Sequence, residues 1–257
     1  MKLRRAPRTP HESRSLRAWL FPVAVVAIPF LLGGAFTLRH HLFPPKGRAA
    51  EAAQVSSLPA GHGPVRHGIM TTVFWVGEGA TGENDYISNV PSAWDGEWQT
   101  HFGGVDDPDH RSGYGPAKFT PKENPFYFAL PYNDLNINGI RKSTGQNCLA
   151  YSPATDDKHS WCKNTWIAII YKGKTVYAQW EDVGPNEEDD IAYVFGNANP
   201  KNTFEAKAGL DVSPAVRDYL GLDGDNLTTW TFVHAADVPD GPWKVHVTAS
   251  QGYKVDD

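Results

Sequence analysis

Several familiar functional signatures are missing from this chain of 257 residues. It has no glycine-rich loop of the kind that cradles phosphate groups, and no serine in the strand–turn–helix motif of serine hydrolases. The sequence also shows no internal repeat and no long heptad pattern. These absences exclude nucleotide-binding loops, esterase-type nucleophiles, repeat arrays and coiled coils from the functions to be considered.

Cysteine is scarce, since Cys148 and Cys162 are the only two in the chain. A zinc site would need further ligands at close spacing, and only His159 is near. In an oxidising compartment the two cysteines would instead form one disulfide, worth about 3 kcal/mol through its effect on the unfolded state. We therefore expect a Cys148–Cys162 bond, with two free thiols as the alternative, and no bound metal or other cofactor.

Acidic residues are almost absent from the first part of the chain. Residues 1–17 hold six Lys or Arg side chains and one acid, Glu12, and residues 18–38 carry no charge. A run of this length can cross a bilayer as a helix, and its basic flank favours the cytoplasmic side. We predict a cytoplasmic tail (1–17), a transmembrane signal-anchor (18–38) and an exported, periplasmic or extracytoplasmic C-terminal domain. The alternative is a cleaved signal peptide and a secreted protein.

The part of the chain that follows the basic tail is strongly acidic. The whole chain has a formal net charge of −5 although its first 17 residues are basic. Acidic domains bind nucleic acids and anionic lipid surfaces poorly, because like charges repel. We therefore expect no nucleic-acid partner, and a membrane contact only through the N-terminal helix.

Proline and glycine divide the remainder into two parts. Residues 39–68 contain Pro44, Pro45, Gly47, Pro59 and further glycines without a sustained apolar period, so they are expected to form a flexible linker. Residues 69–257 are enough for one globular domain.

Within this domain, strand signals outnumber helix signals. Lys172-Gly173-Lys174 predicts a tight hairpin, and residues 213–220 read as a short helix that Ser213 can cap. We therefore expect a mainly β fold, a small closed barrel with one or two short helices. Six segments are rich in β-branched and aromatic residues and end at Gly, Pro or Asn: 70–76, 126–130, 165–171, 175–180, 228–233 and 243–248.

Two short motifs each deliver one carboxylate directly after strand-like or turn-forming residues. The first is EDVGP at 181–185, which contains Asp182, and the second is LDVSPAV at 210–216, which contains Asp211. Two acids from separate segments can meet in one cleft. A pair of carboxylates is the usual equipment for cleaving a glycosidic bond.

These motifs resemble the double-psi β-barrel of the rare lipoprotein A family, in which an Asn-Asp-Arg-Gly-Pro-like turn is followed by an Asp-Leu-Ser that opens a short helix. The resemblance covers about residues 126–247 and implies a six-stranded double-psi β-barrel. Related barrels occur in endoglucanases, expansins and membrane-bound lytic transglycosylases. They imply that Asp211 is the proton donor, and we expect Asp182 to be the second catalytic carboxylate.

Some positions depart from this pattern. Val183 stands where the family usually has Arg in the turn, so any contact made by that Arg is missing. Endoglucanases add a second Asp in their first strand, where this chain has Val76, which argues against a plain inverting cellulase. Glu78, expected on the same strand face, is a candidate replacement. The insertion between Pro185 and Asp211 is expected to form an extra loop over the groove.

Aromatic side chains are candidates for stacking on sugar rings. For each tryptophan the alternative is a place in the core. The acidic run at 106–110 has the oxygen ligands for a cation, but a solvated loop is the preferred interpretation. The predicted substrate-binding residues are Trp75, Glu78, Trp94, Trp98, Trp180 and Tyr193, with Trp161 as a further candidate.

Both acids also have a purely structural explanation, because Asp in a turn or ahead of a helix often binds backbone amides. Three functions therefore stay open. The first is a membrane-tethered lytic transglycosylase or glycoside hydrolase that acts on peptidoglycan or another wall polysaccharide. The second is a non-catalytic, expansin-like glycan-binding module, and the third is a structural envelope protein.

Overall fold

The computed structural model describes residues 46–58, 63–84, 86–149, 158–204, 206–224 and 226–250. The predicted cytoplasmic tail (1–17) and transmembrane segment (18–38) lie outside these residues. Within the described ranges, every helix is too short or too polar to span a bilayer.

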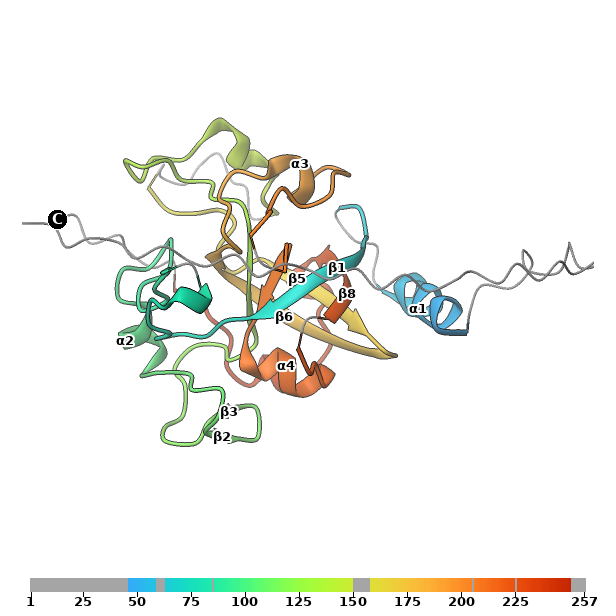
Figure 1. The fold of residues 1–257 in the computed structure, drawn as a ribbon, viewed down its shortest axis with the longest axis horizontal. Coiled ribbons are helices and arrows are strands. Elements are labelled where there is room, and N and C mark those ends of the chain that lie inside the picture. The colour runs from blue at the N-terminus through green and yellow to red at the C-terminus, as the bar shows by residue number, and fades with distance from the viewer. Residues whose placement is uncertain are drawn as a thin grey trace, which may run out of the picture. The chain divides into compact units, whose positions relative to one another are not determined.

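Six strands close into a β-barrel (Figure 1). β1 runs parallel to β7, and β4 runs parallel to β6, whereas the other neighbours in the barrel are antiparallel. The predicted mainly β fold with a closed six-stranded barrel is confirmed. In order around the barrel the strands are β1 (Arg66–Val73), β7 (Leu210–Val212), β4 (Tyr127–Leu130), β6 (Lys174–Val183), β5 (Trp166–Tyr171) and β8 (Asn226–Val233).

Large aromatic side chains from three strands form the main core. Phe128 on β4, Trp180 on β6 and Phe232 on β8 are buried, and the ring of Trp180 lies 5.9 Å from each of the other two rings. Each apolar side chain of this size contributes about 1.5–3 kcal/mol when it leaves water. Successive residues of a strand alternate between this core and the opposite face, and in β4 and β5 the residues on both faces are buried.

The predicted hairpin connects β5 and β6. Tyr171 pairs with Lys174 across a two-residue turn, and both turn residues, Lys172 and Gly173, have positive φ (45° and 86°). This backbone matches the twist of the two strands. The prediction of a tight turn at this place is confirmed.

The predicted helix after the second motif is α4 (Pro214–Leu220). The Ser213 hydroxyl accepts a hydrogen bond from the Val216 amide, and Gly221 ends the helix in the left-handed region (φ 76°). This cap fixes the helix directly behind β7. Asp211, in the middle of β7, is therefore held between a paired strand and a capped helix.

One predicted strand is wrong, and another was not recognised. Residues 243–248 have a strand-like pattern, but Pro242–Lys244 is a short 3₁₀ helix (η4), and Trp243 packs into the core. The sixth strand of the barrel is β7, which has only three residues. A segment this short gives no clear period-2 pattern, so its strand character comes from pairing with β1 and β4.

The predicted flexible linker at 39–68 is also corrected in part. Residues Lys46–Ser57 form helix α1, and β1 already begins at Arg66. The alanine-rich sequence explains this helix, since alanine is the strongest helix former. Glu51 ties α1 to the barrel through the hydroxyl of Thr229 on β8.

Residues 77–125 pack against the barrel through a second apolar cluster. Phe74, Val76, Trp98 and Phe102 meet Tyr127 and Ala129 of β4, on the opposite face from the main core. The remaining elements are η1 (Gly82–Asn84), α2 (Trp98–Phe102), β2 (Arg111–Ser112), β3 (Gly115–Pro116), η2 (Ser143–Asn147), α3 (Ile191–Val194) and η3 (Ala235–Asp237).

Cys148 and Cys162 form the predicted disulfide, with Cα atoms 5.0 Å apart. The bond links the end of η2 to the segment that precedes β5.

Candidate active site: a groove lined by carboxylates

Four residues on four neighbouring strands form a row across the barrel. Thr72 on β1 pairs with Asp211 on β7, Asp211 pairs with Ala129 on β4, and Ala129 pairs with Asp182 on β6. The two acids are thus two strands apart, about 10 Å between Cα atoms. Because the residue between them is alanine, only a methyl group separates their side chains.

A register shift in β6 brings Asp182 into this row. Phe128 pairs with Trp180, but the next residue, Ala129, pairs with Asp182, so Glu181 is an extra residue in the ladder. Without this bulge Asp182, which comes two residues after Trp180, would face the core as Trp180 does. The β-bulge at Glu181 therefore turns Asp182 toward the face on which Asp211 lies.

The row forms part of a groove with a volume of about 820 Å³. This is within the range of small-molecule sites. The walls come from the segment after β1, from the insertion between Pro185 and Asp211, and from the end of α4 with the loop that follows. The predicted extra loop thus does line the groove. Its polar lining includes Asp211, Asp182, Glu78, Asn89, Asn186 and Asn202.

Asp211 is held by a single side chain. The Thr72 hydroxyl donates a hydrogen bond to Oδ1, and a Cβ atom on Gly184 would lie 3.7 Å from Oδ2. Burial raises the pKa of Asp211 to about 6, against the effect of the Thr72 hydrogen bond and with a contribution from the negative charge of Glu78. A carboxyl group with this pKa retains a proton at mildly acidic pH, as a general acid requires.

Asp182 is held by the backbone. Its Oδ1 accepts hydrogen bonds from the amides of Ala93 and Val183, each 2.7 Å long. Burial raises the pKa of Asp182 to about 7 in spite of these two bonds, and the charge of Asp211 adds to the shift. Asp182 is therefore a fixed carboxyl group that changes its charge near neutral pH.

Glu78 reaches the groove through a turn. β1 ends at Val73, and the Glu78 amide donates to the carbonyl of Trp75 (3.0 Å). The prediction that Glu78 lies on a strand is therefore wrong, although the residue lines the groove. Its carboxylate accepts a hydrogen bond from Asn89 Nδ2 (2.7 Å), and burial raises its pKa.

Four of the predicted substrate-binding residues lie in the apolar clusters instead. Each is no more than 2% exposed, and in three of them, Trp94, Trp180 and Tyr193, the polar atom is hydrogen-bonded within the protein. Trp180 Nε1 donates to the carbonyl of Asp182 (2.7 Å), and the Tyr193 hydroxyl donates to the carbonyl of Gly209 (2.9 Å). Large rings gain most free energy by leaving water, which explains why these residues lie in the core and not in the groove. The four are Trp94, Trp98, Trp180 and Tyr193.

The other aromatic candidates differ from each other. Trp75 lines the groove next to Glu78. Trp161 lies against the guanidinium of Arg141, 3.4 Å from the ring centroid, and is not part of the groove lining. Of the tryptophans predicted to bind substrate, Trp75 is thus the one that can contact a molecule in the groove.

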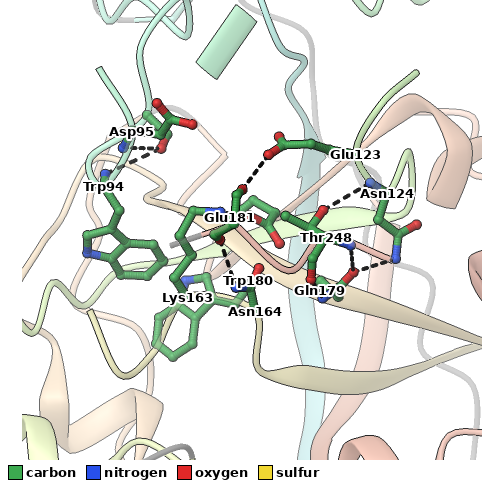
Figure 2. Close-up of polar contacts among 12 residues, drawn as sticks. Trp94, Asp95, Glu123, Asn124, Lys163, Asn164, Gln179, Trp180, Glu181 and Thr248 are labelled. Atoms are coloured by element: carbon green, nitrogen blue, oxygen red, sulfur yellow. Dashed lines mark hydrogen bonds and ion pairs between the residues drawn. The ribbon is translucent and has the colours of Figure 1, made fainter. Parts of the chain in front are cut away.

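Behind the groove, the bulge residue Glu181 belongs to a buried polar network (Figure 2). Its Oε2 lies 2.5 Å from Lys163 Nζ, and both residues are 1% exposed. Burial alone would lower the pKa of Lys163, but the carboxylates of Glu181, Glu123 and Asp95 outweigh this effect and raise it. Burial raises the pKa of Glu181 against the opposing effect of Lys163. Glu181 is thus a partner of a buried cation rather than a groove residue.

Two acids of the run at 106–110 contact neighbouring side chains. Asp106 is fully buried, pairs with Arg111 and accepts a hydrogen bond from the Tyr127 hydroxyl (3.0 Å). Asp107 pairs with His110 (2.7 Å). The run is therefore neither the expected solvated loop throughout nor an arrangement of free cation ligands.

Within the described ranges, one group of side chains has the spacing of metal ligands, namely Asp134 with Cys148 and Cys162. The two sulfur atoms are already bonded to each other. Asp134 accepts hydrogen bonds from the Ser160 hydroxyl and the Trp161 amide, both 2.7 Å long. This group therefore stabilises the disulfide region and is not a metal site.

The sequence analysis missed several groove residues. Asn186 and Asn202 come from the insertion, whereas Arg217 and Asp223 come from α4 and the loop after it. For Asn186, Asn202 and Asp223 the only sequence signal is the frequency of Asn and Asp in segments rich in Gly and Pro, which is equally typical of ordinary turns, and nothing in the sequence distinguishes Arg217.

The fold and the groove define a class: a small closed β-barrel with several carboxyl groups lining one groove. A scan against protein-family models found no match, and a search of curated proteins found no significantly similar sequence. What this chain does is therefore inferred from its own residues.

Proposed function

We propose that this protein is an exported enzyme that cleaves a wall glycan with Asp211 as general acid, and that its barrel is of the double-psi type. The two parallel strand pairs, β1 with β7 and β4 with β6, support the double-psi assignment. The order of the EDVGP turn and the LDVSPAV helix, as in the rare lipoprotein A family, supports it as well.

One observation carries the catalytic proposal: Asp211, Asp182 and Glu78 line one groove, and burial raises the pKa of all three carboxyl groups. A buried structural carboxylate is commonly paired with a cation, as Asp106 is with Arg111. Asp211 has the hydroxyl of Thr72 in place of a cation. Raised pKa values at an open groove are typical of acid–base sites.

The roles follow from these positions. Asp211 protonates the leaving glycosidic oxygen, and Glu78, which also lines the groove, accepts a proton from the attacking group. Asp182, across the methyl group of Ala129, has a higher pKa than Asp211, so it still holds its proton where Asp211 is protonated, and it positions the substrate. Attack by water gives hydrolysis, whereas attack by the sugar's own hydroxyl gives the anhydro-sugar product of a lytic transglycosylase.

The test is digestion of purified peptidoglycan sacculi and of neutral wall polysaccharides, with the products identified by mass spectrometry. New reducing ends would indicate hydrolysis, and anhydro-sugar ends would indicate transglycosylation. Asp211→Asn serves as the inactive control, because it retains an Oδ1 acceptor for Thr72. Equal product release by the wild type and by this variant would contradict the proposal.

Export is a separate part of the proposal and depends on residues 1–38. Reporter fusions made after residue 60 should be active only outside the cytoplasm. Recovery of a soluble protein that begins near Ala49 would show cleavage instead of anchoring. Reporter activity in the cytoplasm would contradict export altogether.

A second candidate is a non-catalytic, expansin-like glycan-binding module. Val183 occupies the place of the family's Arg, and Val76, in place of the endoglucanase Asp, is fully buried. Both observations remove polar groups that related enzymes have. This candidate predicts that wild-type protein binds glycan, releases no product, and is unaffected by Asp211→Asn.

A further inference from the structure

The groove has an unusual charge distribution. Among the described residues that line it, five carry a carboxyl group and one, Arg217, carries a positive charge. The five are Glu78, Asp109, Asp182, Asp211 and Asp223.

The single cation is largely neutralised within the protein. Arg217 Nε and Nη2 lie 2.8 Å from Asp218 Oδ1, and Nη2 also donates to the carbonyl of Pro108 (2.9 Å). Arg217 is therefore already engaged and is poorly placed to bind an anionic group of a ligand. The field in the groove remains negative even where some of its buried acids hold protons, because Asp109 and Asp223 are exposed.

Other groove residues suit a ligand with many hydroxyl groups. Asn186 is exposed and its side-chain amide can donate and accept hydrogen bonds, and carboxylates accept hydrogen bonds from hydroxyl or ammonium groups. Trp75 and Phe204 add apolar surface to the lining. This combination fits the two sides of a sugar ring, one polar at its rim and one apolar at its face.

We infer that the groove binds glycan segments made of neutral or amine-bearing sugars and discriminates against sugars that carry carboxylate, phosphate or sulfate groups. This inference rests on the proposed function and narrows its substrate class. Anionic groups entering the groove would meet like charges with no free cation to pair with. In a wall polymer, the sugars next to Asp211 are then those without free acidic substituents.

The test compares length-matched oligosaccharides by calorimetry with Asp211→Asn, which should bind but not turn over. The probes are chitosan, chitin and polygalacturonate oligosaccharides, which are cationic, neutral and anionic. We expect the first two to bind at least about tenfold more tightly than the third. The preference for chitosan over chitin should weaken as salt is added, because salt screens charges.

Charge-neutralising variants at the groove rim supply a matched comparison. Asp109→Asn and Asp223→Asn should each reduce the preference for chitosan over polygalacturonate by about two- to fivefold. Asp240→Asn is the control, because Asp240 is also exposed but does not line the groove. If the rim variants behave like this control, the charge inference is wrong.

The outcomes separate this inference from the proposed enzyme activity. Binding of polygalacturonate as tight as that of chitin would overturn the inference, whether or not the protein cleaves glycans. The expected binding order without any product from the wild type would support the inference and overturn the catalytic role. If none of the three probes binds, the glycan function is wrong and the inference fails with it.

Discussion

Glu181 and Asp182 are neighbours on β6, yet they lie in two different electrostatic environments. Glu181 faces the buried network and has the ammonium group of Lys163 2.5 Å away. Asp182 faces the groove and is held by two backbone amides without a cation. The bulge that separates them allows one short segment to contribute both to the support of the barrel and to the groove.

The comparison indicates how a structural acid can be told from a functional one in this protein. Burial raises the pKa of both carboxyl groups, so the pKa alone does not distinguish them. The distinguishing features are the partner and the place: Glu181 has a buried cation, whereas Asp182 and Asp211 have neutral hydrogen-bond donors and line the groove. Removing a charge should therefore lower the free energy of unfolding on the side of Glu181 and raise it on the side of Asp182.

The largest effect is expected for Asp211→Asn on activity. General acid catalysis contributes about 10²–10⁴-fold, so kcat/KM for glycan cleavage should fall by at least that order. Asp182→Asn should reduce activity by a smaller factor, since it orients substrate or changes the protonation of its neighbour. The measurement is the initial rate of product release by each purified variant. Equal rates for wild type and Asp211→Asn would place Asp211 among the structural acids.

The next largest effect is expected on stability, from Lys163→Met. This change leaves Glu181 buried without its cation and should lower the free energy of unfolding at pH 7 by about 3–5 kcal/mol. Chemical denaturation measures this loss, and the exposed Lys118→Met is the control, expected within about 0.5 kcal/mol of wild type. The double variant Lys163→Met, Glu181→Met should recover part of the stability. If Lys163→Met lowers the free energy of unfolding by no more than the control does, Lys163 is not a stabilising partner of Glu181, and Glu181 and Asp182 do not differ in this respect.

Removing a charge in the groove should raise the free energy of unfolding, by less than Lys163→Met lowers it. The pKa of Asp211 is about 6 and that of Asp182 about 7 in the folded protein, against 3.8 for an ordinary Asp. The folded state therefore binds more protons than the unfolded state between about pH 4 and 7, and stability falls as the pH rises through this window. Asp211→Asn or Asp182→Asn should be about 1–3 kcal/mol more stable than wild type at pH 7.5.

This gain should shrink toward pH 4, where both acids hold their protons in the wild type as well. Denaturation curves at several pH values test this dependence. A destabilised Asp182→Asn at pH 7.5 would mean that Asp182 has a stabilising partner comparable to that of Glu181.

The smallest effect is expected for Thr72→Val on the pH dependence of activity. The Thr72 hydrogen bond lowers the pKa of Asp211, so its loss should raise this pKa, by about one unit or less. A general acid works only while protonated, so the alkaline limb of the pH–rate profile should move to higher pH. An unchanged limb would indicate that Asp211 does not control it.

The sequence was most informative where the structure is local. Ser213 and Pro214 predicted the start of α4, and Lys172-Gly173-Lys174 predicted the turn between β5 and β6, because caps and tight turns depend on a few adjacent residues. The sequence was least informative for β7. Its three residues form a strand only because β1 and β4 lie on either side.

The candidate site shows the same division. Asp211, Asp182, Trp75 and Glu78 were predicted from motifs and do line the groove. Four aromatic residues were assigned to it and lie in the apolar clusters, since the residue type alone does not show whether an aromatic side chain faces the core or a groove. The rim residues from the insertion and from the loop after α4 could not be predicted, because only the closed barrel brings them to the groove.

The sequence by itself determined the strand-rich composition, the two acidic motifs and the disulfide, since each depends on residue type and on short spacing. Only the tertiary structure decided which of two adjacent acids faces the groove. Strand alternation alone would have turned Asp182 inward beside Trp180, and the extra residue in β6 reverses it. A bulge is a property of the pairing between two strands, here β4 and β6, and so it cannot be read from either strand alone.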